Sequence, residues 1–216
     1  MALLRQFIYG VTDDNLYKRI GWMYVSFFLL FMPVTALSYF LLPEAILRGK
    51  HPIISQLQLS SNMWVSTLQI FGYNLIPTAL IIGSNLLAQQ SRFARNRFVP
   101  IGYWAFWSLI IYCAVVMGTW SFEVVMTAPP LSYRLLGIFD ITHRSGLIEF
   151  SAYILAATAS FGLTRWYSDG KQIVASKQWR DVSISKHERM FLLFAFVLLL
   201  CAGLIESYRI MQVTSG

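Results

Sequence analysis

The sequence contains little charge, little cysteine and little histidine. Only 12% of its 216 residues are Asp, Glu, Lys or Arg, whereas a soluble domain carries roughly 25%. So few charges cannot cover a water-facing surface, which excludes an ordinary soluble globular domain. The two cysteines lie inside apolar runs, and the three histidines are far apart. These features exclude a disulfide framework and predict no metal site.

Apolar residues are abundant instead, at 56% of the chain, and the mean hydropathy is +0.56. Five apolar runs approach the length of about 20 residues that a helix needs to cross a bilayer. We therefore predict an all-α polytopic membrane protein, with five transmembrane helices in one bundle and a single membrane domain over residues 1–216. The spans are expected at about 20–42, 64–88, 101–121, 146–166 and 190–210.

Residues 1–19 are expected to form a short amphipathic segment on the cytoplasmic side, before the first span. No secretory signal is expected, because no apolar stretch of the required length precedes Asp13 and Asp14. Twelve Lys and Arg residues lie on the N-terminal side of the predicted membrane and five on the other. The positive-inside rule therefore places the N-terminus in the cytoplasm and the C-terminus outside.

The net charge of +7 is interpreted in the same way. Basic loops orient a membrane protein against anionic lipid, so the bilayer is the expected partner and nucleic acid is not.

Two glutamates, Glu149 and Glu206, lie inside predicted spans, toward the outer side. A charged carboxyl at the bilayer centre costs on the order of 3 kcal/mol, so both should face other helices or water. We predict an intramembrane polar cluster of Glu149 and Glu206 with His143 and Asn74, while Arg144 and Arg209 are further possible partners. The cluster either binds a proton, a cation or a partner protein, or holds two carboxyls hydrogen-bonded to neighbouring helices near span ends.

Small residues accompany both glutamates. Stripes of small residues let helices approach closely in lipid. The predicted helix-packing positions are Gly146, Ala152, Ala156 and Ser160 in the fourth span, and Ala202 and Gly203 in the fifth.

No catalytic residue and no cofactor is predicted. The nearest match to the G-x-S-G of an intramembrane serine protease is HRSG at 143–146, which has His143 in place of glycine. The sequence has no H-E-x-x-H, no paired aspartates within spans, no phosphate-binding loop and no C-x-x-C. We therefore expect a protein that is not an enzyme.

Two stretches carry a family resemblance, LLLCAGLIESYRI (198–210) and GLIEFSAYILAATASFGL (146–163). With a weaker match around Asn74, they resemble the stage II sporulation protein M family over about residues 64–210. Ser145 stands where that family usually has histidine, and Tyr73 stands where it has a first asparagine. The resemblance implies a five-span protein of a prokaryotic cytoplasmic (inner) membrane, without catalysis, that assembles with cell-wall remodelling factors.

The leading expectation is a non-catalytic scaffold or accessory subunit in a hetero-complex with other membrane or envelope proteins. The alternative is a transporter, a channel or a transport-complex subunit in which Glu149 and Glu206 form an ion- or proton-binding site. Replacement of either glutamate by glutamine separates the two, because only a carboxyl can release a proton.

Overall fold

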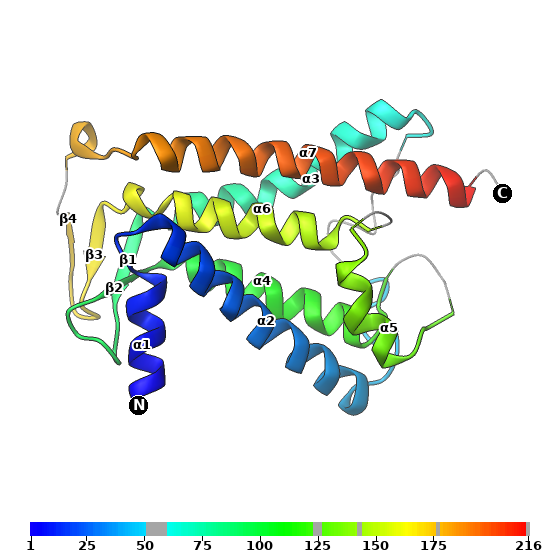
Figure 1. Cartoon of the computed structure of the whole chain (residues 1–216), viewed down its shortest axis with the longest axis horizontal. Coiled ribbons are helices and arrows are strands. Elements are labelled where there is room, and N and C mark those ends of the chain that lie inside the picture. The colour runs from blue at the N-terminus through cyan, green and yellow to red at the C-terminus, as the bar shows by residue number, and fades with distance from the viewer. Residues whose placement is uncertain (51–59, 123–126, 142–143, 176–177, 215–216) are drawn as a thin grey trace.

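Five long helices run along the length of the molecule, and each is apolar enough to cross a membrane (Figure 1). The computed structural model describes residues 1–50, 60–122, 127–141, 144–175 and 178–214. A helix satisfies its own backbone hydrogen bonds, as apolar surroundings require. The prediction of five helices long and apolar enough to span a membrane is confirmed, as a multi-pass membrane protein requires. These helices are α2 (Leu16–Leu41), α3 (Met63–Ser84), α4 (Ile101–Gly118), α6 (Gly146–Ala159) and α7 (Lys186–Thr214).

The centre of the bundle is α6, which the short helix η3 (Phe161–Leu163) extends to a spanning length. Every residue from Ala152 to Ala159 is buried, and four of these eight are alanine. α6 contacts all four other spanning helices. Its small side chains explain this, because they let several helices approach one axis.

A four-stranded sheet stands at one end of the bundle, so the predicted all-α class is wrong in this respect (Figure 1). β1 pairs in parallel with β3, whereas the two outer pairs, β2 with β1 and β3 with β4, are antiparallel. The strands in spatial order are β2 (Phe98–Pro100), β1 (Leu87–Gln90), β3 (Trp166–Ser168) and β4 (Ile173–Ala175).

The sheet forms because the ends of α3 and α6 are tied together. The Asn85 side chain is fully buried, and its Nδ2 donates to the carbonyl oxygen of Ala157 (2.8 Å) and to Oγ of Ser160 (2.6 Å). Thr164 Oγ1 donates back to the carbonyl oxygen of Asn85 (2.9 Å). The segments that follow α3 and α6 therefore leave the bundle side by side, and they pair as the parallel strands β1 and β3.

At the sheet end of the bundle, three span limits differ from the predicted ones. The second span ends at Ser84 rather than 88, and the fourth ends at Leu163 rather than 166, because the residues that follow enter β1 and β3. The fifth begins at Lys186, four residues before the predicted 190.

The predicted amphipathic segment contains helix α1 (Ala2–Val11), which lies beside the sheet and across the direction of the long helices (Figure 1). Tyr9 donates its hydroxyl hydrogen to Oδ1 of Asn96 (2.7 Å), and Arg97 Nη1 donates to the carbonyl oxygen of Thr12 (3.2 Å). α1 is thereby fastened to the turn between β1 and β2.

A buried arginine organises the opposite end, where α5 (Leu131–Leu136) and η2 (Gly137–Phe139) lie. Arg134 is 1% exposed, and its Nη2 pairs with Oε1 of Glu44 (2.6 Å). Its Nη1 donates to the carbonyl oxygen of Gly118, the last residue of α4. One guanidinium thus joins α5 to the end of α4 and to the segment after α2.

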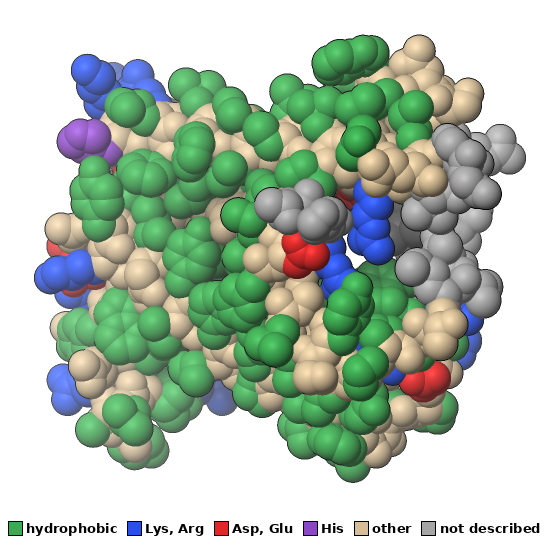
Figure 2. Space-filling model, turned by 45° about the vertical axis from the view of Figure 1, so that its right-hand side comes forward, with side chains coloured by type: hydrophobic (Ala, Val, Ile, Leu, Met, Phe, Trp, Pro, Cys, Tyr) green, Lys and Arg blue, Asp and Glu red, His purple; other side chains and the backbone are tan. Residues whose placement is uncertain are grey.

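The charges are distributed unevenly between the two ends. Apart from Lys177, which lies outside the described residues, the twelve basic residues that were counted on the N-terminal side belong to segments at the sheet end. On the face in Figure 2, hydrophobic side chains cover the middle of the molecule and several Lys and Arg side chains gather at its left. The N-terminus lies at the sheet end and α7 ends at the other (Figure 1).

Gly118 tests the contact between α4 and α2. A Cβ there would lie 2.5 Å from the carbonyl oxygen of Thr35 and 2.7 Å from Cβ of Ser38. Gly118→Ala should therefore lower the free energy of unfolding by about 1–3 kcal/mol. In the control Gly72→Ala, the new Cβ meets nothing within 4 Å, so the change should be neutral or stabilising by up to about 1 kcal/mol. Thermal unfolding in detergent measures both, and equal midpoints would contradict the packing described.

Candidate functional site

Two carboxyl side chains meet between α6 and α7, toward the end of the bundle away from the sheet. Glu149 lies in the first turn of α6, and Glu206 lies on α7 about two turns before its end. The two carboxyls are close enough to interact electrostatically. Ser145, at the N-cap position of α6, donates from Oγ to Oε2 of Glu206, although this hydrogen bond is long at 3.4 Å.

α3 supplies the third side of this cluster through Asn74. Tyr153 lies one turn after Glu149, so the two side chains share a face of α6. The Tyr153 hydroxyl donates to Oδ1 of Asn74 (3.1 Å). Because this bond occupies the oxygen of the amide, its NH₂ group remains available as a donor.

Two buried atoms of the cluster have no hydrogen-bond partner among the described residues, namely Oε1 of Glu149 and Nδ2 of Asn74. A buried polar atom without a partner costs about 1–3 kcal/mol. One of these atoms is an acceptor and the other a donor, and the Asn74 side chain lies close enough to the Glu149 carboxyl to interact with it. The other unpaired buried atoms in the described part belong to separate side chains, those of Arg19, Thr35, Asn85, Tyr103 and Trp120.

The residues predicted for this cluster fall into three groups. Glu149, Glu206 and Asn74 come together as described, whereas His143 lies outside the described residues. Arg144 instead stacks on the ring of Tyr133, with its Cζ 4.5 Å from the ring centroid. Arg209 interacts electrostatically with Glu206.

The small residues predicted for helix packing differ in burial. Five are buried, and one, Gly146, is half-buried with open space where its Cβ would stand. A Cβ on Gly203 would lie 3.1 Å from the carbonyl oxygen of Thr67, so this glycine lets α7 approach α3. The five buried positions are Ala152, Ala156, Ser160, Ala202 and Gly203.

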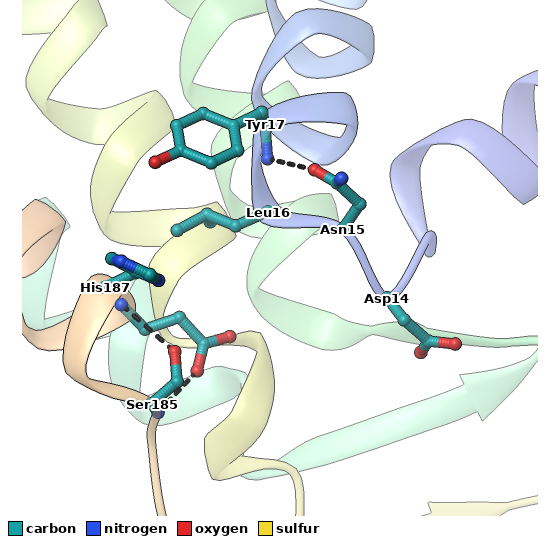
Figure 3. A pocket seen from close by; sticks show the side chains of 7 residues that line it. Asp14, Asn15, Leu16, Tyr17, Ser185 and His187 are labelled. Carbon is teal, nitrogen blue, oxygen red and sulfur yellow. Dashed lines mark hydrogen bonds between the residues drawn. The ribbon is translucent and has the colours of Figure 1, made fainter.

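A pocket of about 320 Å³ opens at the sheet end of the bundle, between the starts of α2 and α7 (Figure 3). Three of its polar side chains, those of Asn15, Ser185 and Glu188, take part in helix capping. Asn15 Oδ1 accepts from the backbone N–H of Tyr17 (2.9 Å). Ser185 and Glu188 cap each other: the Ser185 N–H donates to Oε2 of Glu188 (2.8 Å), and the Glu188 N–H donates to Oγ of Ser185 (3.2 Å). The other polar side chains that line it are those of Asp14, Tyr17 and His187.

Behind this pocket lies a buried ion pair. Arg19 is 2% exposed, and its Nη2 lies 2.7 Å from Oε1 of Glu188. Arg19 also donates to the carbonyl oxygens of Asp13 (2.8 Å) and Thr158 (3.3 Å). One side chain thus joins the start of α2 to α6 and α7, which assigns it a structural role.

Nearby, the backbone N–H of Asn15 and the ammonium of Lys18 hold the pKa of Asp13 below its usual value. The Asp13 carboxylate therefore stays ionised at neutral pH, and its stabilisation of this turn is lost as the pH falls through that lowered pKa.

The buried ion pair was not predicted from the sequence, although half of it could have been. The stretch SKHE at 185–188 has the S-x-x-E pattern of a capping box directly before an apolar run. Nothing local indicates that the Glu188 carboxylate also meets Arg19, because the two residues are 169 positions apart.

Within the described part of the chain, no three His, Cys, Asp or Glu side chains gather as metal ligands. Comparisons of the chain with protein-family models, curated proteins and solved structures found no match. The resemblance to the stage II sporulation protein M family therefore stays a prediction.

Breaking the buried ion pair should be costly. Arg19→Met leaves the Glu188 carboxylate buried without its partner, and such a change costs about 3–5 kcal/mol. The control Lys18→Met removes the neighbouring cation, which is exposed and 3.7 Å from Asp13, and should cost less than about 1 kcal/mol. Thermal unfolding in detergent compares the two variants. Similar losses would show that Arg19 acts only as a surface charge.

Proposed function

We propose that the protein binds a proton or a small cation within the membrane and acts in transport, either alone or as a subunit of a transport complex. The observation that carries this proposal is the unpaired Oε1 of Glu149 beside the carboxyl of Glu206. The alternative prediction was that both carboxyls are hydrogen-bonded to neighbouring helices. It accounts for the bond from Ser145 to Glu206 but not for Oε1 of Glu149.

The physical argument is one of charge in an apolar medium. Two carboxylates side by side repel each other, and the repulsion strengthens as the dielectric constant falls. A proton or cation between them relieves the repulsion and engages the free oxygen. Ionisable groups inside spans are expensive and typically mark ion or proton pathways. The two carboxyls therefore have the chemistry of a reversible proton or cation site, and the NH₂ group of Asn74 is available to donate to a carboxylate oxygen.

The second candidate function is the non-catalytic scaffold or accessory subunit, and strand β4 favours it. Ile173 is 64% exposed, Val174 is 52% exposed, and Ala175 is exposed too. β4 pairs with β3 on one side, and no described strand pairs with its other edge. An exposed apolar edge strand is a surface to which a strand of another chain can be added. We propose that a partner membrane protein would bind here.

Replacing either glutamate tests the leading proposal. Glutamine keeps the shape and the hydrogen bonds of the side chain but cannot carry a proton or a charge. In proteoliposomes with an imposed pH or cation gradient, Glu149→Gln and Glu206→Gln should each reduce flux at least about tenfold, the loss of roughly 1.4 kcal/mol of binding or barrier free energy.

The matched control is Asp181→Asn, which removes an exposed carboxyl at the sheet end and should leave flux unchanged. Wild-type flux that survives in both glutamine variants would overturn the coupling role. Infrared spectra of the protein in lipid add a readout without transport, because a protonated-carboxyl band should disappear in the same variants.

A photo-crosslinking amino acid at position 174 tests the second candidate. In native membranes it should give a defined adduct with one partner protein, because Val174 is exposed on the free strand β4. The same group at Leu193, which is 66% exposed on spanning helix α7, should label lipid instead. An adduct pattern at 174 that matches the one at 193 would argue against a docking strand.

A further inference from the structure

The turn between β1 and β2 presents two arginines and an aromatic ring on a rigid frame. Ser91 fixes this turn: its N–H donates to the carbonyl oxygen of Arg97 (2.9 Å), and its Oγ accepts from the N–H of Phe93 (3.2 Å). Arg92, Phe93 and Arg95 all have exposed side chains. A frame held by its own hydrogen bonds keeps these three groups in a fixed arrangement.

The two arginines line a pocket of about 290 Å³ that the turn between β3 and β4 completes. Neither guanidinium has a hydrogen bond, ion pair or ring contact with another described residue. Arginine binds phosphate oxygens through two parallel N–H donors, so a pair of free guanidinium groups suits a phosphate. The lining residues are Gln89, Gln90, Ser91, Arg92, Arg95, Asp169 and Gly170.

The surroundings of this turn place it at the level of lipid headgroups. α1 is fastened to the turn through Tyr9 and Asn96, and it lies across the direction of the spanning helices (Figure 1). Leu3 is 81% exposed and Leu4 is 47% exposed on this helix, as in helices that rest in the membrane interface. Phe93, 47% exposed between the two arginines, is a further apolar group at this level.

We propose that this pocket binds the phosphodiester of a phospholipid headgroup between Arg92 and Arg95, while Phe93 enters the membrane interface. This inference is independent of the carboxyl pair. It assigns to the sheet end a defined lipid site, in addition to the diffuse attraction of basic loops to anionic lipid.

Asp169 sets which headgroups fit. The backbone N–H groups of Gln172 (2.9 Å) and Lys171 (2.8 Å) donate to its Oδ1, and they hold its pKa below the usual value. The carboxylate is therefore ionised at neutral pH and disfavours a bare phosphate dianion. It accepts hydrogen bonds from the ammonium of phosphoethanolamine or the hydroxyls of phosphoglycerol. Choline has neither kind of donor, so phosphocholine should bind most weakly.

Native mass spectrometry of the full-length protein in detergent tests this site. Phosphatidylethanolamine, phosphatidylglycerol and phosphatidylcholine with identical acyl chains are added at matched concentrations. We expect the first two to bind about tenfold more tightly than the third, and Arg92→Gln/Arg95→Gln to remove that difference. Arg92→Lys/Arg95→Lys keeps the charge without the two-pronged geometry and should retain only part of the preference.

The control Arg180→Gln/Lys186→Gln removes the same charge from exposed positions at the same end and should behave like the wild type. If the control lost the same preference among the lipids, the preference would come from diffuse charge rather than from this site, and the proposal would be overturned. Equal binding of all three lipids by the wild type would also overturn it. Displacement of bound lipid by millimolar inorganic phosphate would overturn the headgroup assignment in favour of a soluble phosphate. Gel filtration of every variant checks that the fold is intact.

Discussion

The close packing of four helices around α6 is the constraint on which the rest of the structure depends. Between helices in lipid the hydrophobic effect contributes little, so contact area and hydrogen bonds must hold the bundle together. The stretch from Ala152 to Ala159 supplies that area because it is buried throughout and half of its residues are alanine. The cost is length: α6 alone has 14 residues and needs η3 to reach across a bilayer. Because α6 is short, other segments form the two ends of the molecule: the sheet at one end, and α5 with η2 at the other.

Polar side chains at several depths join α6 and α7 to α3, and most of them have partners. Asn85 bonds to Ala157 and Ser160 near the sheet, and the Tyr153 hydroxyl bonds to Asn74 farther along. Ser66 and Ser207, both buried, meet at 3.2 Å. Each such bond contributes on the order of 1 kcal/mol within a membrane. Oε1 of Glu149 is one of the few buried side-chain atoms of the described residues that lack such a partner.

Much of the fold was predictable from the sequence, because hydropathy and helix length report directly on spans. The five spans and the amphipathic N-terminal segment follow from such local patterns. The proximity of Glu149 to Glu206 was expected instead because ionisable groups inside spans avoid lipid and face other helices. The sheet does not follow from local patterns, since strands such as Trp166–Ser168 are too short for a period-two pattern to emerge. The burial of Arg134 does not follow either, because it depends on Glu44, 90 positions away. What was missed depends on contacts between segments far apart in the chain.

The parallel pairing of β1 with β3 has a consequence for biogenesis. β1 follows the second span and β3 follows the fourth, so their ladder can close only after two further helices have been synthesised and inserted. Until then β1 has only β2 as a neighbour, and the turn to which α1 is fastened lacks half of its support. Closure of the sheet therefore reports that the fourth span has entered the membrane in register.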